Sequence, residues 1–312
     1  MRQTVLIIGK VETPEVRHLM QQLTRHSYRI LVLDTSRFGS DSFISYEPER
    51  ASGWLRVNHE EVAFKQIHSV FWDQFYPFNT NNDQPGIHGN NPHDKYSLLE
   101  VLFQQPHIRW FNSVTVMRSH KCKPWQLTLA AQGDLRLPAT CIGNHPDRVR
   151  LFLNKHPDII IKPVHGGRFT YRFRKDQDQA PHHTGQASAQ AAGQEPATLQ
   201  QYIGGTNIRS YLIDDYCFCG ELQSSYVDFR EDSHTRYRPH TLPDELVRQG
   251  RALMLRLGMH WGAIDWRLDE QGHYYFLEIN PAPRFAHFET ISQLPIAATL
   301  ARCLCAKAGV SF

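Results

Sequence analysis

The chain has 312 residues, of which 41% are hydrophobic and 21% charged, and its formal net charge is +3 at pH 7. This composition is ordinary for a globular protein, and the length is enough for two or three compact units. The charge excess is too small to indicate nucleic acid or an anionic membrane as a main partner. No apolar run reaches membrane-spanning length and the N-terminus lacks a signal-peptide pattern, so we expect a cytoplasmic protein. Because none of its six cysteines has C-x-x-C spacing, we expect reduced thiols.

The first third of the chain predicts an open α/β unit. Buried-strand patterns alternate with helical periodicity, and Pro14 stands at the start of the first helix. The predicted elements are strand 4–9, helix 14–26, strand 28–34, strand 69–75, a helix through 95–105 and strand 108–112. We therefore expect residues 1–112 to form an N-terminal α/β domain.

The middle of the chain predicts a smaller mixed domain over residues 113–199. Its predicted elements are a helix at 119–132 that ends before Gly133, a helix at 146–156, and a strand, loop and strand within 158–173. Residues 176–197 are low in complexity and poor in large apolar groups, so we expect a mobile insertion there.

The remaining residues, 200–312, predict a third domain. Its predicted elements are strands at 198–203, within 207–222 and at 224–229, a helix at 244–258, a β-hairpin, and a last helix around 295–308. The hairpin joins Trp261–Leu268 to the run that starts at His273, because the sequence DEQG between them is typical of a turn.

The predicted hairpin places three oxygen donors on one face. If Leu268 pairs with His273, then Asp265, Glu278 and Asn280 share a face, and Ile264, Trp266, Leu268, Tyr275, Leu277 and Ile279 lie on the core side. Asp265 and Glu278 would be diagonal neighbours, about 7–8 Å apart. Oxygen ligands suit Mg²⁺, which binds one or two carboxylates and completes its shell with water and phosphate oxygens. The pattern indicates a nucleotide-bound metal, with a solvated hairpin face as the alternative.

Several cations stand where they could neutralise an anionic ligand. Lys162 ends a strand just before Gly166 and Gly167, and such a placement favours phosphate binding, although a plain turn is the alternative. Arg209 and Arg230 fall in or just after strands, where a guanidinium fork could bind a carboxylate or a phosphate. Salt bridges at a sheet edge are the alternative for these arginines. Arg267 shares the predicted metal face with Asp265, and Lys121 lies near a helix start.

The serial order of these motifs resembles that of the RimK-like ATP-grasp ligases, and most closely that of the microviridin-type (graspetide) peptide-maturing ligases. The resemblance covers roughly residues 112–301. It is carried by GTNIRSYLI, YVDFRED, YRPHTLP, GAIDWRL and YYFLEINP, in that order. It implies an α/β (α+β) ATP-grasp fold with an N-terminal open α/β pre-ATP-grasp domain.

The resemblance also implies roles for individual residues. Those expected to bind ATP are Lys121, Lys162, Gly166 and Gly167 at the phosphates and Gln200, Gln201, Tyr202 and Ile203 at the adenine hinge. Magnesium would be held by Asp265, Glu278 and Asn280, and Arg209, Arg230 and Arg267 would act at the reacting groups. The implied reaction phosphorylates a carboxylate, and an amine or hydroxyl then attacks the acylphosphate.

Three segments depart from the family pattern. Gln201 replaces the usual hinge glutamate, Asp73 and Gln74 stand where arginines are usual, and PAPRF replaces a glycine-containing segment after the metal motif. The last two departures concern the regions expected to border the substrate.

These observations lead to one principal hypothesis and three alternatives. The principal hypothesis is an ATP- and Mg²⁺-dependent ligase that makes side-chain ester or amide crosslinks in a ribosomal precursor peptide. A RimK-like ligase of small molecules or of a protein terminus is the second. A nicotinamide-dependent oxidoreductase is remote, because no G-x-G-x-x-G follows the first strand, and a relative that binds peptide without turnover is disfavoured. The expected partners are ATP and a carboxylate-bearing substrate with its acceptor, with a homodimer as a candidate assembly and no nucleic acid or membrane.

Overall fold

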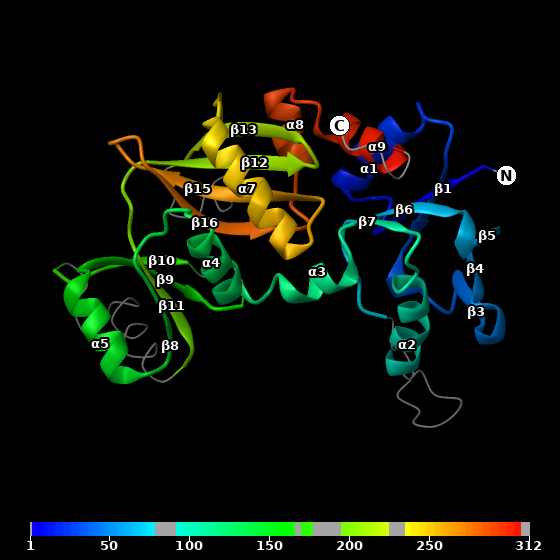
Figure 1. The fold of residues 1–312 in the computed structure, drawn as a ribbon, viewed down its shortest axis with the longest axis horizontal. Helices are drawn as coiled ribbons and strands as arrows, with labels where there is room; N and C mark the ends of the chain where they lie inside the picture. Colours follow the sequence, from blue (N-terminus) through cyan, green and yellow to red (C-terminus); the bar gives the residue numbers. More distant parts are fainter. Residues whose placement is uncertain (1, 79–91, 166–169, 177–194, 225–234, 307–312) are drawn as a thin grey trace.

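A computed structural model describes residues 2–78, 92–165, 170–176, 195–224 and 235–306 of the chain. Figure 1 shows three parts, with the C-terminal sheet between the N-terminal unit and the smaller central sheet. Residues 2–112 are called the N-terminal unit, β8–β11 the central sheet and β12–β16 the C-terminal sheet. The predicted insertion at 176–197 and the predicted strand at 224–229 fall almost wholly outside the described residues.

The N-terminal unit is built on a parallel sheet in the order β2-β1-β6-β7. Its strands are β1 (Thr4–Ile8), β2 (Arg29–Leu33), β6 (Ile67–Trp72) and β7 (Arg109–Phe111). Helix α1 (Pro14–Leu23) follows β1, with Thr13 as its N-cap residue. Helix α2 (Pro92–Phe103) precedes β7. Alternate residues of β1 point to opposite faces, and the structure buries both faces, as is typical of a parallel sheet.

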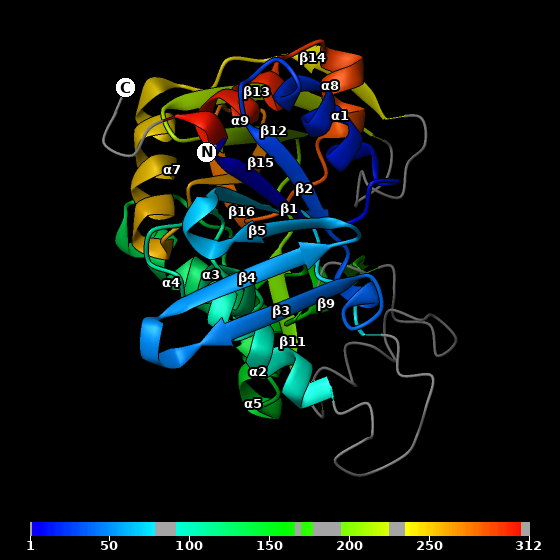
Figure 2. The same ribbon diagram turned by 90° about the vertical axis from the view of Figure 1, so that its right-hand side faces the viewer.

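A three-stranded antiparallel meander also belongs to this unit and was not predicted. It consists of β3 (Ser42–Glu47), β4 (Ser52–Val57) and β5 (Glu60–Ala63), and Figure 2 shows it in front of the parallel sheet. Only alternate residues of β4 and a single residue of β5 are buried, so its apolar pattern is weak.

The central sheet is antiparallel where its strands pair and has the order β10-β9-β11-β8. Its strands are β8 (Thr140–Gly143), β9 (Asp158–Pro163), β10 (Tyr171–Arg174) and β11 (Ala197–Gln201). Helix α5 (Pro146–Lys155) covers one face, where Val149 packs in a cluster with Ile159, Ile161 and Leu199. The opposite face of the sheet therefore carries the alternate residues, among them Lys162 and Gln200.

The C-terminal sheet is antiparallel with the order β14-β13-β12-β15-β16. Its strands are β12 (Thr206–Ile213), β13 (Tyr216–Gln223), β14 (Arg236–Pro239), β15 (Trp261–Leu268) and β16 (Tyr274–Asn280). One face packs against α4 (Lys123–Gln132) and α7 (Asp244–Leu257). The other face meets α8 (Ala286–Ser292), α9 (Ile296–Cys305) and the N-terminal unit.

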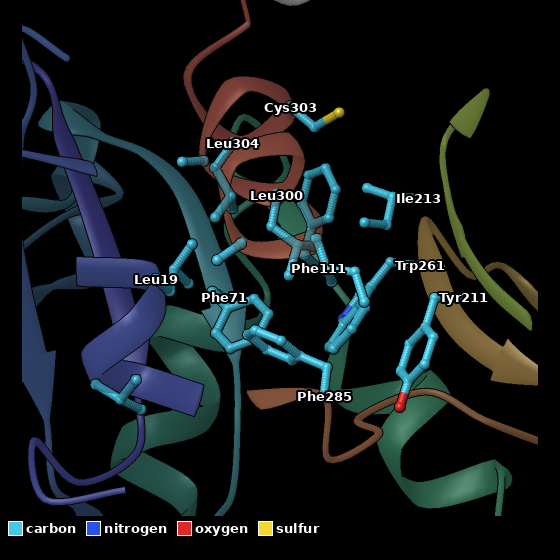
Figure 3. Packing of buried hydrophobic residues seen from close by; sticks show 14 of the residues in the cluster. Leu19, Phe71, Phe111, Tyr211, Ile213, Trp261, Phe285, Leu300, Cys303 and Leu304 are labelled. Carbon is cyan, nitrogen blue, oxygen red and sulfur yellow. The ribbon is translucent and has the colours of Figure 1, made fainter. Parts of the chain in front are cut away.

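The N-terminal unit and the C-terminal sheet share one hydrophobic core. Figure 3 shows Phe71 and Phe111 beside Trp261, Phe285 and Leu300. The ring centroids of Phe71 and Trp261 are 5.3 Å apart, and those of Trp261 and Phe285 are 5.9 Å apart. Close packing of this kind fixes the two parts relative to each other.

The fully buried carboxamide of Asn112 adds polar contacts at the same junction. Its nitrogen donates to the carbonyl oxygens of Trp261 and Pro281, both at 2.8 Å. Its oxygen accepts from the backbone N–H of His260 at 2.7 Å. One side chain thus connects the end of the N-terminal unit to both ends of the β15–β16 hairpin.

The helix predicted at 119–132 ends as predicted but begins later, so that prediction was wrong at its start. Helix α3 (Val114–Ser119) ends before a short turn, and α4 begins at Lys123 with Pro124 in its first turn. Proline fixes its own φ and disfavours a helical conformation for the residue before it, which favours a new start there. Lys121 therefore lies in the turn between two helices.

The hairpin register also differs from the prediction. Leu268 lies opposite Tyr274 rather than His273, and a one-residue shift exchanges the two faces of a strand. A β-bulge then adds Leu277 as an extra residue, so that Asp265 pairs with Glu278. Tyr275 consequently lies opposite Arg267 on the polar face, and Phe276 is the fully buried residue.

Candidate functional site

The oxygen donors predicted for a metal do share one face of the C-terminal sheet. Asp265 lies directly opposite Glu278, and Asn280 lies opposite Ala263, two residues earlier on β15. The bulge makes the two carboxylates direct cross-strand neighbours, which are closer than the diagonal pair predicted from sequence. On its other side, Asp265 lies opposite Arg209 of β12.

Arg209 is tightly held by this face. Its Nη1 donates to both carboxylate oxygens of Asp265, at 2.8 and 3.1 Å, and its Nε donates to the Tyr211 hydroxyl at 3.1 Å. The Arg209 and Asp265 side chains are 9% and 12% exposed. Burial alone would lower the pKa of the guanidinium, but the charge of Asp265 and the contact with Tyr211 outweigh it and raise that pKa. Arg209 is therefore a permanent cation next to Asp265.

Glu278 has its own cationic partner, Lys123 at the start of α4, which the sequence analysis did not select. The Lys123 ammonium contacts the Glu278 carboxylate, and both side chains are largely buried. Gln126, three residues later on the same helix face, exchanges two hydrogen bonds with the backbone of Ile279, the residue after Glu278. Because Gln126 fixes α4 along β16, the Lys123 side chain lies next to Glu278. The helical spacing of Lys123 and Gln126 was the signal that could have revealed this lysine.

The donor set fits a hard divalent cation. Two carboxylates and one carboxamide oxygen converge on one face, and magnesium accepts such ligands together with phosphate oxygens. The Asn280 oxygen also accepts from the backbone N–H of Ala282 at 3.0 Å, which fixes the carboxamide at the strand end. Within the described residues no group of three or more His, Cys, Asp or Glu side chains could hold a metal, so a cage made of these side chains alone is absent there.

The central sheet supplies Lys162. Its ammonium donates to the Gln200 carboxamide oxygen at 3.1 Å, and the Gln200 nitrogen donates to the Thr140 hydroxyl at 3.0 Å. The three side chains come from three neighbouring strands and form a polar row on the face away from α5. Gly166 and Gly167, predicted to follow this lysine in a phosphate-binding loop, lie outside the described residues.

The predicted hinge, Gln200–Ile203, crosses from the central sheet to the C-terminal sheet. The guanidinium of Arg172 lies 3.4 Å from the centroid of the Tyr202 ring, and that of Arg267 lies 5.8 Å from it. Arg267 donates to the Ile203 carbonyl oxygen at 2.9 Å and to Asn207 at 2.9 Å. Burial lowers the pKa of Arg267 below its usual value. Arg267 thus contacts the hinge rather than the carboxylates at Asp265 and Glu278.

Charges from more than one segment act on His120, in the turn before α4. Burial lowers the pKa of His120, and the charges of Lys121, Lys123 and His165 add to that effect. His165 follows β9, the strand of Lys162, so the end of that strand lies within electrostatic reach of the α3–α4 turn. Lys121 itself is exposed in this turn, and Arg230 lies outside the described residues.

All six cysteines are free in the structure. Burial raises the pKa of Cys217 to about 11 and that of Cys219 to about 12. In the described part of the chain, no helix is both long and apolar enough to cross a bilayer.

Comparison with known proteins identifies the architecture. No model of a protein family matches the chain. A D-alanine–D-alanine ligase of Laribacter hongkongensis is 35% identical over 130 residues, which is 36% of this chain, and the chain spans 40% of the length of that relative.

Similar solved structures cover almost the whole chain. A RiPP-associated ATP-grasp ligase from Chryseobacterium gregarium, in complex with ADP and a leader and core peptide, has a TM-score of 0.85 at 18% identity, with 98% of this chain and 97% of that chain covered. The macrocyclase MdnB of Microcystis aeruginosa MRC has a TM-score of 0.77 at 22% identity, with 98% and 100% covered. The resemblance inferred from the motifs is thus confirmed at the level of the fold. The protein has the ATP-grasp fold, in an arrangement that matches these peptide-associated ligases over nearly its full length.

Proposed function

We propose that the protein is an ATP- and Mg²⁺-dependent ligase that joins a carboxylate to an amine or hydroxyl, with a ribosomal precursor peptide as substrate and side-chain ester or amide crosslinks as product. The observation that carries this proposal is the pairing of two magnesium-type carboxylates on one face of the C-terminal sheet with two cations, the buried Arg209 and the partly buried Lys123 of α4. A further cation, Lys162, lies on the central sheet, which the predicted hinge connects to the C-terminal sheet.

The residues suit phosphoryl transfer from ATP to a carboxylate. Such a reaction needs charge neutralisation and positioning more than a protein nucleophile. Asp265, Glu278 and Asn280 would hold magnesium, which when bound neutralises charge on the phosphate oxygens. Lys123 and Lys162 would contact phosphate oxygens, with Lys121 as a further candidate, and the hinge backbone would contact adenine.

In the proposed first step, a carboxylate oxygen of the substrate attacks the γ-phosphorus of ATP. The bond from that phosphorus to the bridging oxygen breaks, and ADP leaves. In the second step an amine or hydroxyl attacks the acyl carbon, loses its proton to solvent and expels phosphate. Arg209 would stabilise negative charge on the phosphoryl or acyl oxygens during both steps. Arg230 would act there as well, and Arg267 would support the hinge.

The proposal of a peptide substrate is supported by the peptides that two of the similar structures contain. One of them contains a leader and core peptide, and another is a macrocyclase bound with its precursor peptide. The second candidate function, ligation of small molecules, is supported by the partial sequence match to a D-alanine–D-alanine ligase.

A product assay tests the proposal. The protein is incubated with ATP, Mg²⁺ and either peptides rich in Thr, Ser, Lys, Asp and Glu or a mixture of free amino acids, and nucleotides and masses are measured. We expect ADP and phosphate together with a peptide that loses one water per bond formed. AMP and pyrophosphate would contradict the proposed activation step, and turnover with free amino acids alone would favour the second candidate.

A further inference from the structure

Arg284 makes a second side-chain connection, besides Asn112, between the N-terminal unit and the segment that follows the proposed metal-binding hairpin. It lies between Asn280 and α8, and its Nη1 donates to Glu15 at 2.8 Å and lies 3.4 Å from Asp73. Its Nη2 donates to the side chain of Gln74 at 2.7 Å. The Glu15 and Asp73 side chains are each only 6% exposed, whereas that of Arg284 is 55% exposed.

The two carboxylates that contact Arg284 require a positively charged side chain at position 284. Glu15 is in the first turn of α1 and Asp73 directly follows β6, so the fold of the N-terminal unit brings two buried carboxylates together. Burial raises the pKa of Asp73, Arg284 opposes that effect, and the charge of Glu15 adds to it. Without the guanidinium, two carboxylates would share a site with no counter-charge between them.

The backbone of the same residue supports the catalytic face. The Arg284 carbonyl oxygen accepts a hydrogen bond from the Tyr211 hydroxyl at 2.8 Å. A phenol has a single proton, so its oxygen is left to accept the Nε–H of Arg209, at 3.1 Å. Arg209 in turn donates to Asp265. Tyr211 is 1% exposed, so solvent offers no substitute partner for its hydroxyl.

We propose that Arg284 is a positioning residue. Its side-chain contacts with Glu15 and Asp73 fix the position of its own backbone carbonyl. That carbonyl orients Tyr211, and Tyr211 orients Arg209 and hence Asp265, the proposed metal ligand. Side chain and carbonyl belong to one residue, so a displacement of Arg284 removes the acceptor of Tyr211. The N-terminal unit thereby contributes to magnesium affinity without providing a ligand. The inference rests on the proposed function, because it assumes that Asp265 binds magnesium.

The test uses ADP binding to the full-length protein by calorimetry, first in EDTA and then in saturating Mg²⁺. We call the dissociation constant of ADP in EDTA divided by that in Mg²⁺ the magnesium gain. Loss of an outer partner of a metal ligand commonly lowers metal affinity about 10–100-fold, so we expect Arg284→Met to reduce the gain by about tenfold. ADP affinity in EDTA should stay within about twofold, because the hinge and Lys162 do not contact this chain of hydrogen bonds.

Two further variants separate positioning from general destabilisation. Tyr211→Phe should reproduce the loss, and the double variant should lose no more than the worse single variant, because both changes interrupt one chain. Arg284→Lys keeps the charge and should recover part of the gain. Arg248→Met, which removes an exposed arginine paired with Glu245 on α7, is the matched control and should leave the gain unchanged.

The outcomes distinguish this inference from the proposed function. A wild-type protein that binds no ADP, or that shows no magnesium gain, overturns both. A wild-type gain that persists in Arg284→Met, or losses in the two single variants that multiply in the double variant, overturns the inference alone. Thermal unfolding identifies any variant that fails to fold, and Arg284→Lys then carries the test.

Discussion

Arg209 and Asp265 lie directly opposite each other on β12 and β15, and one guanidinium nitrogen donates to both oxygens of the carboxylate. The contact uses only part of the acceptor capacity of Asp265, since a carboxylate offers about four lone-pair sites. In the proposed function, the same carboxylate would also bind the divalent cation. Five predictions test this site and its surroundings.

Changing Glu278 to Gln should abolish ligase turnover while the protein remains folded. The amide keeps the shape of the side chain but loses the charge that both Lys123 and a metal would contact. We expect a loss on the order of 10²–10³ in rate, as for other charge-stabilising groups. ADP release and thermal unfolding measure the two effects. Glu270→Gln, in the exposed turn of the same hairpin, is the control, and an active Glu278→Gln protein would remove this residue from the metal site.

Lys123→Met should reduce activity more than Lys121→Met. Lys123 contacts Glu278 and is held in place through Gln126, whereas Lys121 is exposed in the turn before α4. The comparison is made by steady-state rates at several ATP concentrations, since a phosphate contact changes ATP dependence as well as rate. The reverse order would restore Lys121 as the principal phosphate lysine.

Arg209→Met should destabilise the fold by about 3–5 kcal/mol, because Asp265 would remain buried without its counter-charge. Urea unfolding followed by circular dichroism gives the free energy. Changing both residues, Arg209→Met with Asp265→Leu, should recover most of the loss, since the buried ion pair is then removed as a unit. A single variant as stable as the wild type would mean that water reaches Asp265.

Alkylation should label Cys122 well before the buried thiols. The thiolate is the reactive form, and burial raises the pKa of Cys217 to about 11 and of Cys219, Cys303 and Cys305 to about 12. At pH 8 their thiolate fractions are roughly 10⁻³ to 10⁻⁴, and they increase as the pH rises toward those pKa values. Peptide mapping by mass spectrometry identifies the labelled sites.

Cys122 also reports on nucleotide binding, because it is exposed and lies between Lys121 and Lys123. ADP with magnesium should slow its alkylation. Equal rates with and without nucleotide would place the phosphates away from the start of α4.

The sequence predicted which residues share the polar face of the hairpin but not the register of its strands. Alternation placed Asp265, Glu278 and Asn280 together despite a wrong starting pair, because the bulge at Leu277 adds a second one-residue shift that restores the predicted faces. A bulge depends on the packing of both faces of the sheet, so the sequence of a short strand does not predict it. In the same way, the residue pattern predicted a helix near Lys121, but the start of α4 at Lys123 decided which lysine reaches Glu278.

Long-range contacts were beyond sequence reasoning. Asp73 and Gln74 stand where the sequence departs from the family pattern, and they contact Arg284 of a second departing segment, more than 200 positions away. Each segment is unremarkable alone, and only the fold brings them together. The meander β3–β5 was missed for a related reason, since its strands are short and only partly buried.

The carboxamide of Asn112 makes the chain resistant to division into modules. It satisfies backbone groups of His260, Trp261 and Pro281, and a fragment that began after it would leave those groups without this partner. Exchange of the first hundred or so residues between related proteins would therefore have to preserve this asparagine and the backbone groups that it contacts. Substrate preference in such proteins would then change through exposed loops and side chains rather than by the transplantation of whole units.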